Sequence, residues 1–379
     1  MTLCYVLPAY DSEGKEHYAH VPHLLEVVSE IVPVVLLIEK AKGAPVLNGV
    51  DEVRIAGRPG SSRILRSARF ARHAYAVAKG GDVTFFLLYS RLATTILIVL
   101  LTIVQLKICY WMSGSALLQF DRNTFPKRVE KKLHELHTKW LLRKVDRVFT
   151  GPETMVAYMS EHWNVPDHKL SLLYNDIDTD RFRPPQPGER DQIRQALSWQ
   201  TFEKVVLFVH HLSPRRGSRL IVPVTSRLSQ ELRGKLRLVV VGDGPGLKEL
   251  LSAVDLGGLD DLIEMRGSLP NRTLPDLYRA ADCFLMPSYE EGFPRVVIEA
   301  MASGLPVVAS DAGGTRDVLG KEYPYCVPVG DVEGLVEGLK SVLESPTTRA
   351  EIGTSLRQRA IDRFSTERVS RMMVSELER

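Results

Sequence analysis

Residues 288–307 read SYEEGFPRVVIEAMASGLPV and carry the strongest signal in the chain. They place Glu291 and Glu299 eight residues apart, the first directly before Gly292 and the second within an apolar helical pattern. Because proline has no N–H to lose in the first turn of a helix, Pro294 predicts a helix that begins near it. Glu291 then lies in the loop before the helix, and Glu299 lies about one and a half turns into it.

The start of this predicted helix is suited to binding an anion. Its first N–H groups have no partners within the helix, and the helix dipole adds partial positive charge, so a phosphate is the usual occupant. Two carboxylates beside a phosphate site fit a ligand with both hydroxyl and phosphate groups, such as a nucleotide sugar. The alternative is a strand, a turn and a core helix in which the glutamates stand by chance.

The spacing, the Gly-Phe-Pro after Glu291 and the trailing Glu-Ala-Met-Ala-x-Gly-x-Pro-Val resemble the signature of retaining glycosyltransferases of family 4. The resemblance implies the α/β GT-B architecture, in which two Rossmann-like domains face one another across a cleft. It also implies transfer of a sugar from a nucleotide diphosphate donor, with UDP- and GDP-sugars favoured, to an acceptor hydroxyl. The family retains the anomeric configuration and needs neither a metal nor another cofactor.

Residues 208–217 read FVHHLSPRRG, a predicted strand end followed by a turn. Family 4 usually has Gly-Arg-Leu here and Lys-Gly a few residues on, and its Arg and Lys hold the donor diphosphate. The resemblance implies that Arg216, at the Lys position, and His211, at the Arg position, contact the donor, with Ser213 beside them. Arg216 keeps the charge and can bond two phosphate oxygens, whereas histidine is only partly charged near neutral pH. A turn residue without a ligand is the alternative for His211 and Arg216.

Residues 239–245 read VVVGDGP, a strand that runs into a glycine-rich turn. This spacing suggests a dinucleotide-binding loop, but Leu247 stands where that fingerprint needs glycine. Gly-Asp-Gly-Pro also occurs as a turn in family 4, and the stretch from Arg266 through Asp282 is similar to that family too. The resemblance implies that backbone near residues 266–268 contacts the base.

The resemblance assigns Glu291 and Arg216 as catalytic residues. Glu291 would lie by the sugar, where it orients hydroxyls or stabilises positive charge, and Glu299 would accept hydrogen bonds from the ribose. The implied donor-binding residues are His211, Ser213, Arg216, Gly292, Phe293, Pro294, Val296, Glu299, Arg266 and Gly14.

Asp176, Asp178 and Asp180 form two Asp-x-Asp pairs. Such pairs can bind a divalent cation together with a diphosphate, because hard cations prefer oxygen ligands. The segment also resembles the hinge of family 4, Asn-Gly-Val-Asp followed by Phe-x-Pro, with Asp176 in place of the glycine. We therefore expect no metal at these residues.

The resemblance is weaker in the first domain. Residues 8–17 occupy the place of the family's Gly-Gly loop, which passes close to donor phosphate, but they contain only Gly14. Many members carry a histidine near the sugar after the strand of residues 108–111, where this chain has Trp111-Met-Ser-Gly. Trp111 is either a sugar-stacking face or a core residue, and the acceptor is left open.

Apolar strand-like runs alternate with helical patterns along the whole chain, as in parallel α/β domains. The runs are residues 3–7, 32–38, 83–88, 108–111, 148–150, 205–209, 236–241, 283–286 and 307–310. The Pro-rich polar stretch near residue 185 indicates a linker. We expect an acceptor-side domain over residues 1–185, a donor-binding domain over 186–362 and a C-terminal helix over 363–379 that can pack back on the first domain.

Charge is unevenly distributed, although the net charge is only +3. Residues 54–147 hold eighteen Lys and Arg but five Asp and Glu. Such an excess fits an anionic membrane or an acidic acceptor, and helices with solvated basic faces are the alternative. The apolar run 92–106 is short for a membrane span, so we expect a buried helix, with partial monotopic insertion as the alternative.

The four cysteines show no metal-binding spacing and indicate buried free thiols in a reducing compartment. Residues 1–9 read as a strand instead of a signal peptide, and we expect a cytoplasmic protein, with a peripheral position on the inner face of a membrane left open. The expected acceptor is a glycan, a lipid-linked sugar or a small molecule, and no nucleic acid is expected. The rival functions are a sugar-nucleotide epimerase with the same two domains and a non-catalytic partner subunit that binds nucleotide sugars.

Overall fold

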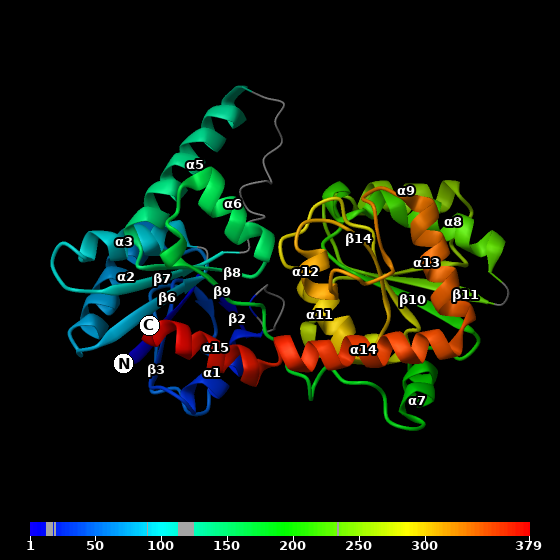
Figure 1. Cartoon of the computed structure of the whole chain (residues 1–379), viewed down its shortest axis with the longest axis horizontal. Coiled ribbons are helices and arrows are strands. Elements are labelled where there is room, and N and C mark those ends of the chain that lie inside the picture. Colours follow the sequence, from blue (N-terminus) through cyan, green and yellow to red (C-terminus); the bar gives the residue numbers. More distant parts are fainter. Residues whose placement is uncertain (13–17, 19, 89, 113–124, 233–234) are drawn as a thin grey trace. The chain divides into compact units, whose positions relative to one another are not determined.

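The computed structural model describes residues 1–12, 18, 20–88, 90–112, 125–232 and 235–379. They form two compact units, one made of Met1–Asp176 with Thr366–Arg379 and the other of Ile177–Ser365. Each unit is a parallel α/β fold, as its alternating apolar runs predict (Figure 1).

Unit 1 contains a parallel sheet with the strand order β5-β3-β1-β6-β7-β8-β9. Its strands are β1 (Thr2–Leu7), β3 (Val34–Ile38), β5 (Glu52–Ile55), β6 (Val83–Leu88), β7 (Lys107–Trp111), β8 (Arg147–Thr150) and β9 (Leu170–Leu172). A separate small pair is formed by β2 (Tyr10–Asp11) and β4 (Ala41–Lys42). The helices are α1 (Val21–Ser29), α2 (Arg63–Ala78), α3 (Arg91–Leu100), α5 (Phe125–Lys144), α6 (Glu153–Trp163) and α15 (Thr366–Glu378).

Unit 2 contains a second parallel sheet with the strand order β12-β11-β10-β13-β14-β15. Its strands are β10 (Lys204–Val209), β11 (Leu236–Val241), β12 (Ile263–Gly267), β13 (Cys283–Met286), β14 (Val307–Ser310) and β15 (Cys326–Val327). The helices are α7 (Glu189–Ala196), α8 (Ile221–Glu231), α9 (Leu247–Leu256), α10 (Leu274–Ala280), α11 (Arg295–Ala302), α12 (Thr315–Leu319), α13 (Val332–Glu344) and α14 (Pro346–Phe364).

The sheet of unit 2 is buried on both faces, which explains why its strands are continuous apolar runs. Every residue of β13 and β14 is buried. One face packs against α8, α9 and α13 in a single hydrophobic core, and α11 packs against α14 (Figure 1). The C-terminal edge of this sheet is therefore held on a rigid base.

The boundary between the units lies nine residues before the expected linker at residue 185. Ile177 pairs with Ser365 in an isolated bridge, and its N–H donates to Phe364 O at 2.7 Å. The ring of Phe182 packs edge-on against Tyr278 at 5.8 Å between centroids. The proline-rich stretch thus belongs to unit 2.

The C-terminal helix α15 is part of unit 1. It packs against α1 and buries Val369, Met373 and Leu377. At its first residue, Thr366 Oγ1 donates to Asp176 Oδ2 at 2.9 Å. The unit 1 fold therefore contains the last fourteen residues as well as the first part of the chain.

The expectation of a buried helix over residues 92–106 is wrong in part. The helix α3 ends at Leu100, and a turn follows. Ala93, Leu97 and Ile98 are buried, but Val99 and Ile103 are more than half exposed. One face of this apolar segment packs on the core, and part of it stays uncovered.

Candidate active site

Two loops of unit 2 meet where the strand order of the sheet changes direction. β10 and β13 are neighbours, and from them the chain continues outward to β12 on one side and to β15 on the other. In open parallel sheets, ligands bind beyond the carboxyl ends of the strands at such a switch point. His210 directly follows β10 and Glu291 follows β13, so both belong to this place in the fold.

Both carboxylate oxygens of Glu291 are bonded. Oε1 lies 2.9 Å from His210 Nε2 and accepts a hydrogen bond of 2.7 Å from Ser288 Oγ. Oε2 forms an ion pair with Nη1 of Arg216. The residue is only 7% exposed, so the carboxylate is fixed by three donors from two loops.

These contacts decide the ionisation of Glu291. Burial raises the pKa of a carboxyl group, because it penalises the charged form. Here the hydrogen bond with His210, the charge of Arg216 and the hydrogen bond from the Ser288 hydroxyl outweigh burial, and the pKa of Glu291 is lowered. The site therefore holds a buried, ionised carboxylate.

The ring of His210 is bonded on both nitrogens. The backbone N–H of His211 donates to Nδ1 of His210 at 2.8 Å. Because Nδ1 must accept that bond, the proton of the neutral ring is assigned to Nε2, which then donates to Glu291. The imidazole thus links the end of β10 to the Glu291 loop.

Three glycines let neighbouring backbone approach these loops. A Cβ on Gly217 would lie 2.0 Å from the Pro287 carbonyl oxygen, and one on Gly313 would lie 2.0 Å from that of Glu291. Gly242, in the turn after β11, would place a Cβ 1.9 Å from His210 O. The Gly-Asp-Gly turn therefore supports the His210 loop, in agreement with its interpretation as a structural turn.

Arg216 lies in a short 3-10 turn, Pro214–Arg216, directly after Ser213. Besides its contact with Glu291, Nη1 donates to Glu290 O at 2.6 Å. Among the described residues, the buried Ser213 Oγ has no hydrogen-bond partner. A polar ligand atom beside this turn would supply that partner, because an unmade bond at a buried hydroxyl is costly.

The helix α11 begins at Arg295, one residue after Pro294, close to where the sequence predicts it. Pro294 is its N-cap and has no polar side chain to cap the first turn. Gly314 N–H donates to Gly292 O at 2.9 Å and holds the loop before the helix. The helix dipole therefore adds partial positive charge near the Glu291 loop.

Glu299 lies within α11 and is 3% exposed. Tyr278 Oη donates to Oε2 at 2.9 Å, and Arg295 Nε lies 3.8 Å from Oε1. Burial raises the pKa of Glu299, against the charges of Arg295 and Arg181 and the Tyr278 hydrogen bond. Ribose binding by this carboxylate stays a prediction, and any ligand would have to reach a largely covered group.

Two other predicted donor residues have roles within unit 2. Phe293 is buried and its ring packs edge-on against Phe364 at 5.7 Å between centroids. The Arg266 guanidinium lies 5.2 Å from the Trp199 ring centroid and pairs with Glu264.

Of the remaining predicted residues, His211 and Val296 make contacts within unit 2. His211 is exposed, and its backbone, not its ring, contacts His210. Val296 is partly buried and its carbonyl accepts a 3.4 Å bond from Tyr278 Oη. Gly14 lies outside the described residues.

Sequence reasoning missed His210, Ser288, Gly313 and Tyr278. His210 stands beside the residue that the family pattern singled out, and the His-His pair after an apolar strand was the available signal. Ser288 lies two residues after the end of β13, within the same motif as Glu291. The contacts of Gly313 and Tyr278 depend on packing between elements and left no local pattern.

Two of the aspartates in residues 176–180 accept hydrogen bonds from the protein itself. Asp178 Oδ1 accepts from the N–H groups of Asp180 and Arg181 at 3.1 and 2.9 Å, and Asp176 accepts from Thr366. No group of three or more His, Cys, Asp or Glu side chains placed to hold a metal occurs in the described part of the chain.

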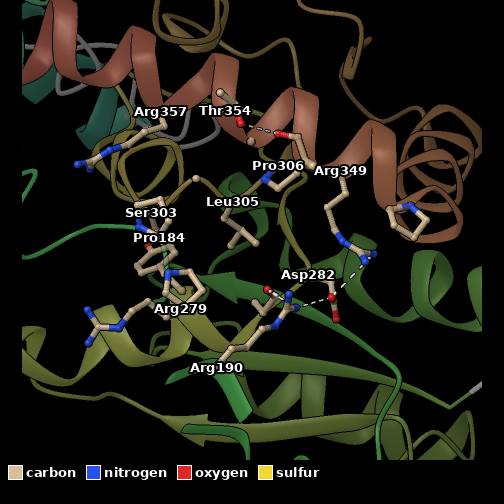
Figure 2. A pocket seen from close by; sticks show the side chains of 17 residues that line it. Pro184, Arg190, Arg279, Asp282, Ser303, Leu305, Pro306, Arg349, Thr354 and Arg357 are labelled. Atoms are coloured by element: carbon tan, nitrogen blue, oxygen red, sulfur yellow. Dashed lines mark hydrogen bonds and ion pairs between the residues drawn. The ribbon is translucent and has the colours of Figure 1, made fainter. Parts of the chain in front are cut away.

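A hollow of about 530 Å³ lies at the opposite edge of the unit 2 sheet, beside the start of β13 (Figure 2). Arg190 pairs with Asp282 there, and Arg349 Nη1 lies 3.9 Å from the same carboxylate. Arg357 Nη1 donates to three carbonyls, those of Thr179, Phe182 and Ala302. These guanidinium groups bind the protein's own acceptors, so the hollow reads as a structural feature.

Known proteins share this fold and this site region. Residues 189–359 match the family model described as Glycosyl transferases group 1. A 2-deoxystreptamine glucosyltransferase from Streptomyces kanamyceticus is 28% identical over 255 residues, which cover 66% of this chain and 65% of that protein. The alignment therefore leaves about a third of the relative outside it.

Solved structures extend the likeness to the whole chain. A sucrose-phosphate synthase from Thermosynechococcus elongatus superposes with a TM-score of 0.81 at 19% identity, covering 100% of this chain and 98% of that one. HepE from Anabaena, solved in complex with UDP, gives a TM-score of 0.77 at 16% identity over 100% of both chains. The fold is the two-domain GT-B fold, as predicted.

Proposed function

We propose that the chain is a retaining glycosyltransferase that moves a sugar from a nucleotide diphosphate sugar to an acceptor hydroxyl. The observation that carries the proposal is the buried carboxylate of Glu291, held by Arg216, His210 and Ser288 at the switch point of the unit 2 sheet. The match of residues 189–359 to group 1 glycosyl transferases supports it. HepE, solved with UDP and with UDP-glucose, supports UDP as the first nucleotide to test.

The proposed reaction breaks the bond between the anomeric carbon and the diphosphate oxygen. The acceptor oxygen forms the new bond on the same face of the sugar, and its proton leaves with the released diphosphate. Arg216 and the start of α11 would stabilise the negative charge that develops on the diphosphate, as fixed donors do in many active sites. The ionised Glu291 would stabilise positive charge on the sugar ring, and we propose that no metal is needed.

We propose that Glu299 binds the ribose through Oε1. Oε2 is taken by Tyr278, whereas Arg295 Nε is 3.8 Å from Oε1, beyond hydrogen-bond distance. Oε1 therefore keeps lone pairs for hydroxyl donors. The backbone near residues 266–268 remains our proposal for the base, since the Arg266 side chain is directed at Trp199.

A thermal-shift screen against UDP, GDP and ADP, with and without EDTA, tests the donor site. A ligand that binds only the folded state raises the melting temperature by mass action. Stabilisation by one nucleotide that EDTA leaves unchanged is the expected result. If none of the three stabilises the protein, the donor site and the proposed function are wrong. The alternative of a non-catalytic subunit that binds nucleotide sugars is then contradicted as well.

Product analysis separates transfer from epimerisation. The stabilising nucleotide's sugar conjugate is incubated with and without candidate acceptors, and the nucleotide products are resolved by chromatography. A transferase releases nucleoside diphosphate in step with glycoside formation. Conversion of the donor to an epimeric nucleotide sugar without acceptor would assign the epimerase function instead.

We also propose a reducing, cytoplasmic location in which unit 1 contacts an anionic membrane. All four cysteines are free and buried, which supports the reducing compartment. In the described part of the chain, no helix has the length and apolarity to span a membrane. Contact at the surface therefore depends on exposed side chains of unit 1.

An apolar face on α5 supports this contact. Leu133, Leu136 and Trp140 share one side of the helix and are 62%, 56% and 40% exposed. α3 lies beside α5, where Thr95 Oγ1 is 3.3 Å from His137 Nε2. Exposed apolar side chains flanked by lysine and arginine are typical of helices that lie in a membrane interface.

Vesicle sedimentation tests the membrane contact. Wild type is expected to sediment with vesicles of phosphatidylcholine and phosphatidylglycerol, and less with phosphatidylcholine alone, because the exposed Lys132, Arg143 and Lys144 lie near the apolar face. Replacing Leu133, Leu136 and Trp140 by glutamine should abolish sedimentation. If wild type does not bind vesicles but forms concentration-dependent dimers that the variant lacks, the apolar face binds a second copy of the chain and not a membrane.

A further inference from the structure

His210 occupies a position where one side chain connects two loops of the site. It directly follows β10, and its side chain is 16% exposed. Nδ1 accepts the His211 N–H at 2.8 Å, and Nε2 lies 2.9 Å from Glu291 Oε1. The ring therefore joins the end of one central strand to the carboxylate that follows its neighbour.

The two hydrogen bonds together fix the tautomer. A backbone N–H can only donate, so Nδ1 must present its lone pair. The neutral ring then carries its proton on Nε2 and directs it at Glu291. The hydrogen bond that Nδ1 accepts thus determines which nitrogen carries the proton. A second proton on Nδ1 would displace the His211 bond, so the bridge is made by the neutral ring.

We propose that His210 is a positioning residue that holds the Glu291 carboxylate in the orientation required for sugar transfer. The inference rests on the proposed function, because it assigns Glu291 to the sugar. Ser288 donates to the same oxygen and Arg216 pairs with the other, so His210 completes the set that fixes the carboxylate plane. The Gly242 turn packs against His210 O and keeps the histidine backbone in place.

Two matched substitutions separate the hydrogen bond from the bulk of the ring. His210→Phe keeps the size but removes the donor, whereas the amide of His210→Gln can still donate to Oε1. Loss of a hydrogen bond to a charged group should lower kcat of His210→Phe by about tenfold to a hundredfold. His210→Gln should recover most of that loss, and the KM for the donor should change little in both.

The pH profile gives a readout that a structural role would not move. Glu291 is faced by His210, Arg216 and Ser288, whose contacts lower its pKa while burial raises it. Without the His210 contact, only Arg216 and Ser288 oppose the effect of burial. The pKa of Glu291 should rise, and the acidic limb of kcat in His210→Phe should move to higher pH. His168→Phe, at an exposed histidine of unit 1, is the control and should keep the wild-type profile.

UDP-glucose hydrolysis and turnover with acceptor are measured on the full chain, with GDP-mannose as the second donor. Wild-type kcat and an unshifted acidic limb in His210→Phe would overturn the inference. If that variant does not fold, ¹⁵N NMR of wild type decides, because a protonated Nδ1 on His210 also overturns it. If NMR shows the proton on Nε2 of His210 but wild type has no activity, the positioning geometry is present and the proposed function is contradicted instead.

Discussion

Tyr278 Oη donates a hydrogen bond of 2.9 Å to Glu299 Oε2, and both residues are almost completely buried. A phenol from α10 thus solvates a carboxylate inside α11. Burial and the nearby Glu299 charge raise the pKa of Tyr278 well above its ordinary value, so the hydroxyl keeps its proton. The pair joins the two helices beneath the proposed ribose site.

Tyr278→Phe should lower the free energy of unfolding by about 1–3 kcal/mol, because it leaves a buried carboxylate with one donor fewer. Urea denaturation at neutral pH measures the change. Tyr289→Phe is the matched control, since Tyr289 is 42% exposed and its hydroxyl can bond water. Equal stability of the two variants would mean that Tyr278 adds nothing to Glu299.

Glu299→Gln should change how stability depends on pH. The folded pKa of Glu299 is raised, so the folded state binds its proton more tightly than the unfolded chain. The contribution of this group is most favourable below the ordinary pKa of 4.5 and is lost as pH rises through the folded value. Glutamine does not titrate, so the variant should gain stability relative to wild type as pH rises above about 4.5.

The same variant should bind the donor less tightly, because an amide presents one acceptor where the carboxylate presents two. Calorimetry with the nucleotide found by thermal shift measures the affinity. Unchanged affinity would exclude a role for Glu299 in ribose binding while leaving the stability argument intact.

Gly313→Ala tests how closely the loop after β14 must approach the Glu291 backbone. Gly313 has φ +52°, and its Cβ would lie 2.0 Å from Glu291 O. Gly258→Ala is the control, since Gly258 has φ +60° but no atom within 4 Å of a Cβ. Both variants carry the strain of a left-handed residue, about 1–2 kcal/mol, but only Gly313→Ala should also displace Glu291 and lower turnover. Equal turnover of the two would show that the loop can move aside.

Arg357→Met should destabilise unit 2 strongly. Nη1 donates to the carbonyls of Thr179, Phe182 and Ala302 at 2.9, 2.7 and 2.6 Å, and removing it takes a charged donor from all three acceptors. We expect a loss of about 2–4 kcal/mol by urea denaturation. Arg371→Met, at an exposed arginine, should stay within about 0.5 kcal/mol of wild type. Comparable losses in both would contradict a specific role for the three bonds.

The sequence predicts best what depends on local patterns. The apolar runs of β11 and β13 give the strand bounds, and Pro294 gives the start of α11 within one residue. Short edge strands such as β5 and β15 escape prediction because each has only a few residues, and none of β5 and only Cys326 of β15 is buried. These strands form by pairing with a neighbouring strand, and a local sequence pattern does not show that pairing.

The site is only half predictable for the same reason. Glu291 and Arg216 follow from a motif, but the contact of Glu291 with His210 joins positions 81 residues apart and exists only because β10 and β13 are neighbours. The position of Arg266 could be matched to a pattern, whereas the direction of its side chain is set by Trp199. The direction of a side chain depends on packing between elements, which exists only in the folded chain.

Glu291→Gln should lower kcat by about a hundredfold with little change in donor affinity, because the charge is proposed to act only on the developing positive sugar. Glutamine keeps the shape, but its NH₂ group must face one of the donors on His210, Ser288 or Arg216. Glu290→Gln is the control, because that neighbouring side chain is exposed and should leave turnover unchanged.

Stability measurements on the same pair separate this charge from its catalytic role. The pKa of Glu291 is lowered in the folded state, so its contribution is present above the ordinary value of 4.5 and is lost as pH falls through the folded value. Wild type should be more stable than Glu291→Gln at neutral pH, and the difference should shrink below about pH 4.5. Wild-type turnover at saturating donor in Glu291→Gln would remove Glu291 from the mechanism, even if the stability difference is observed.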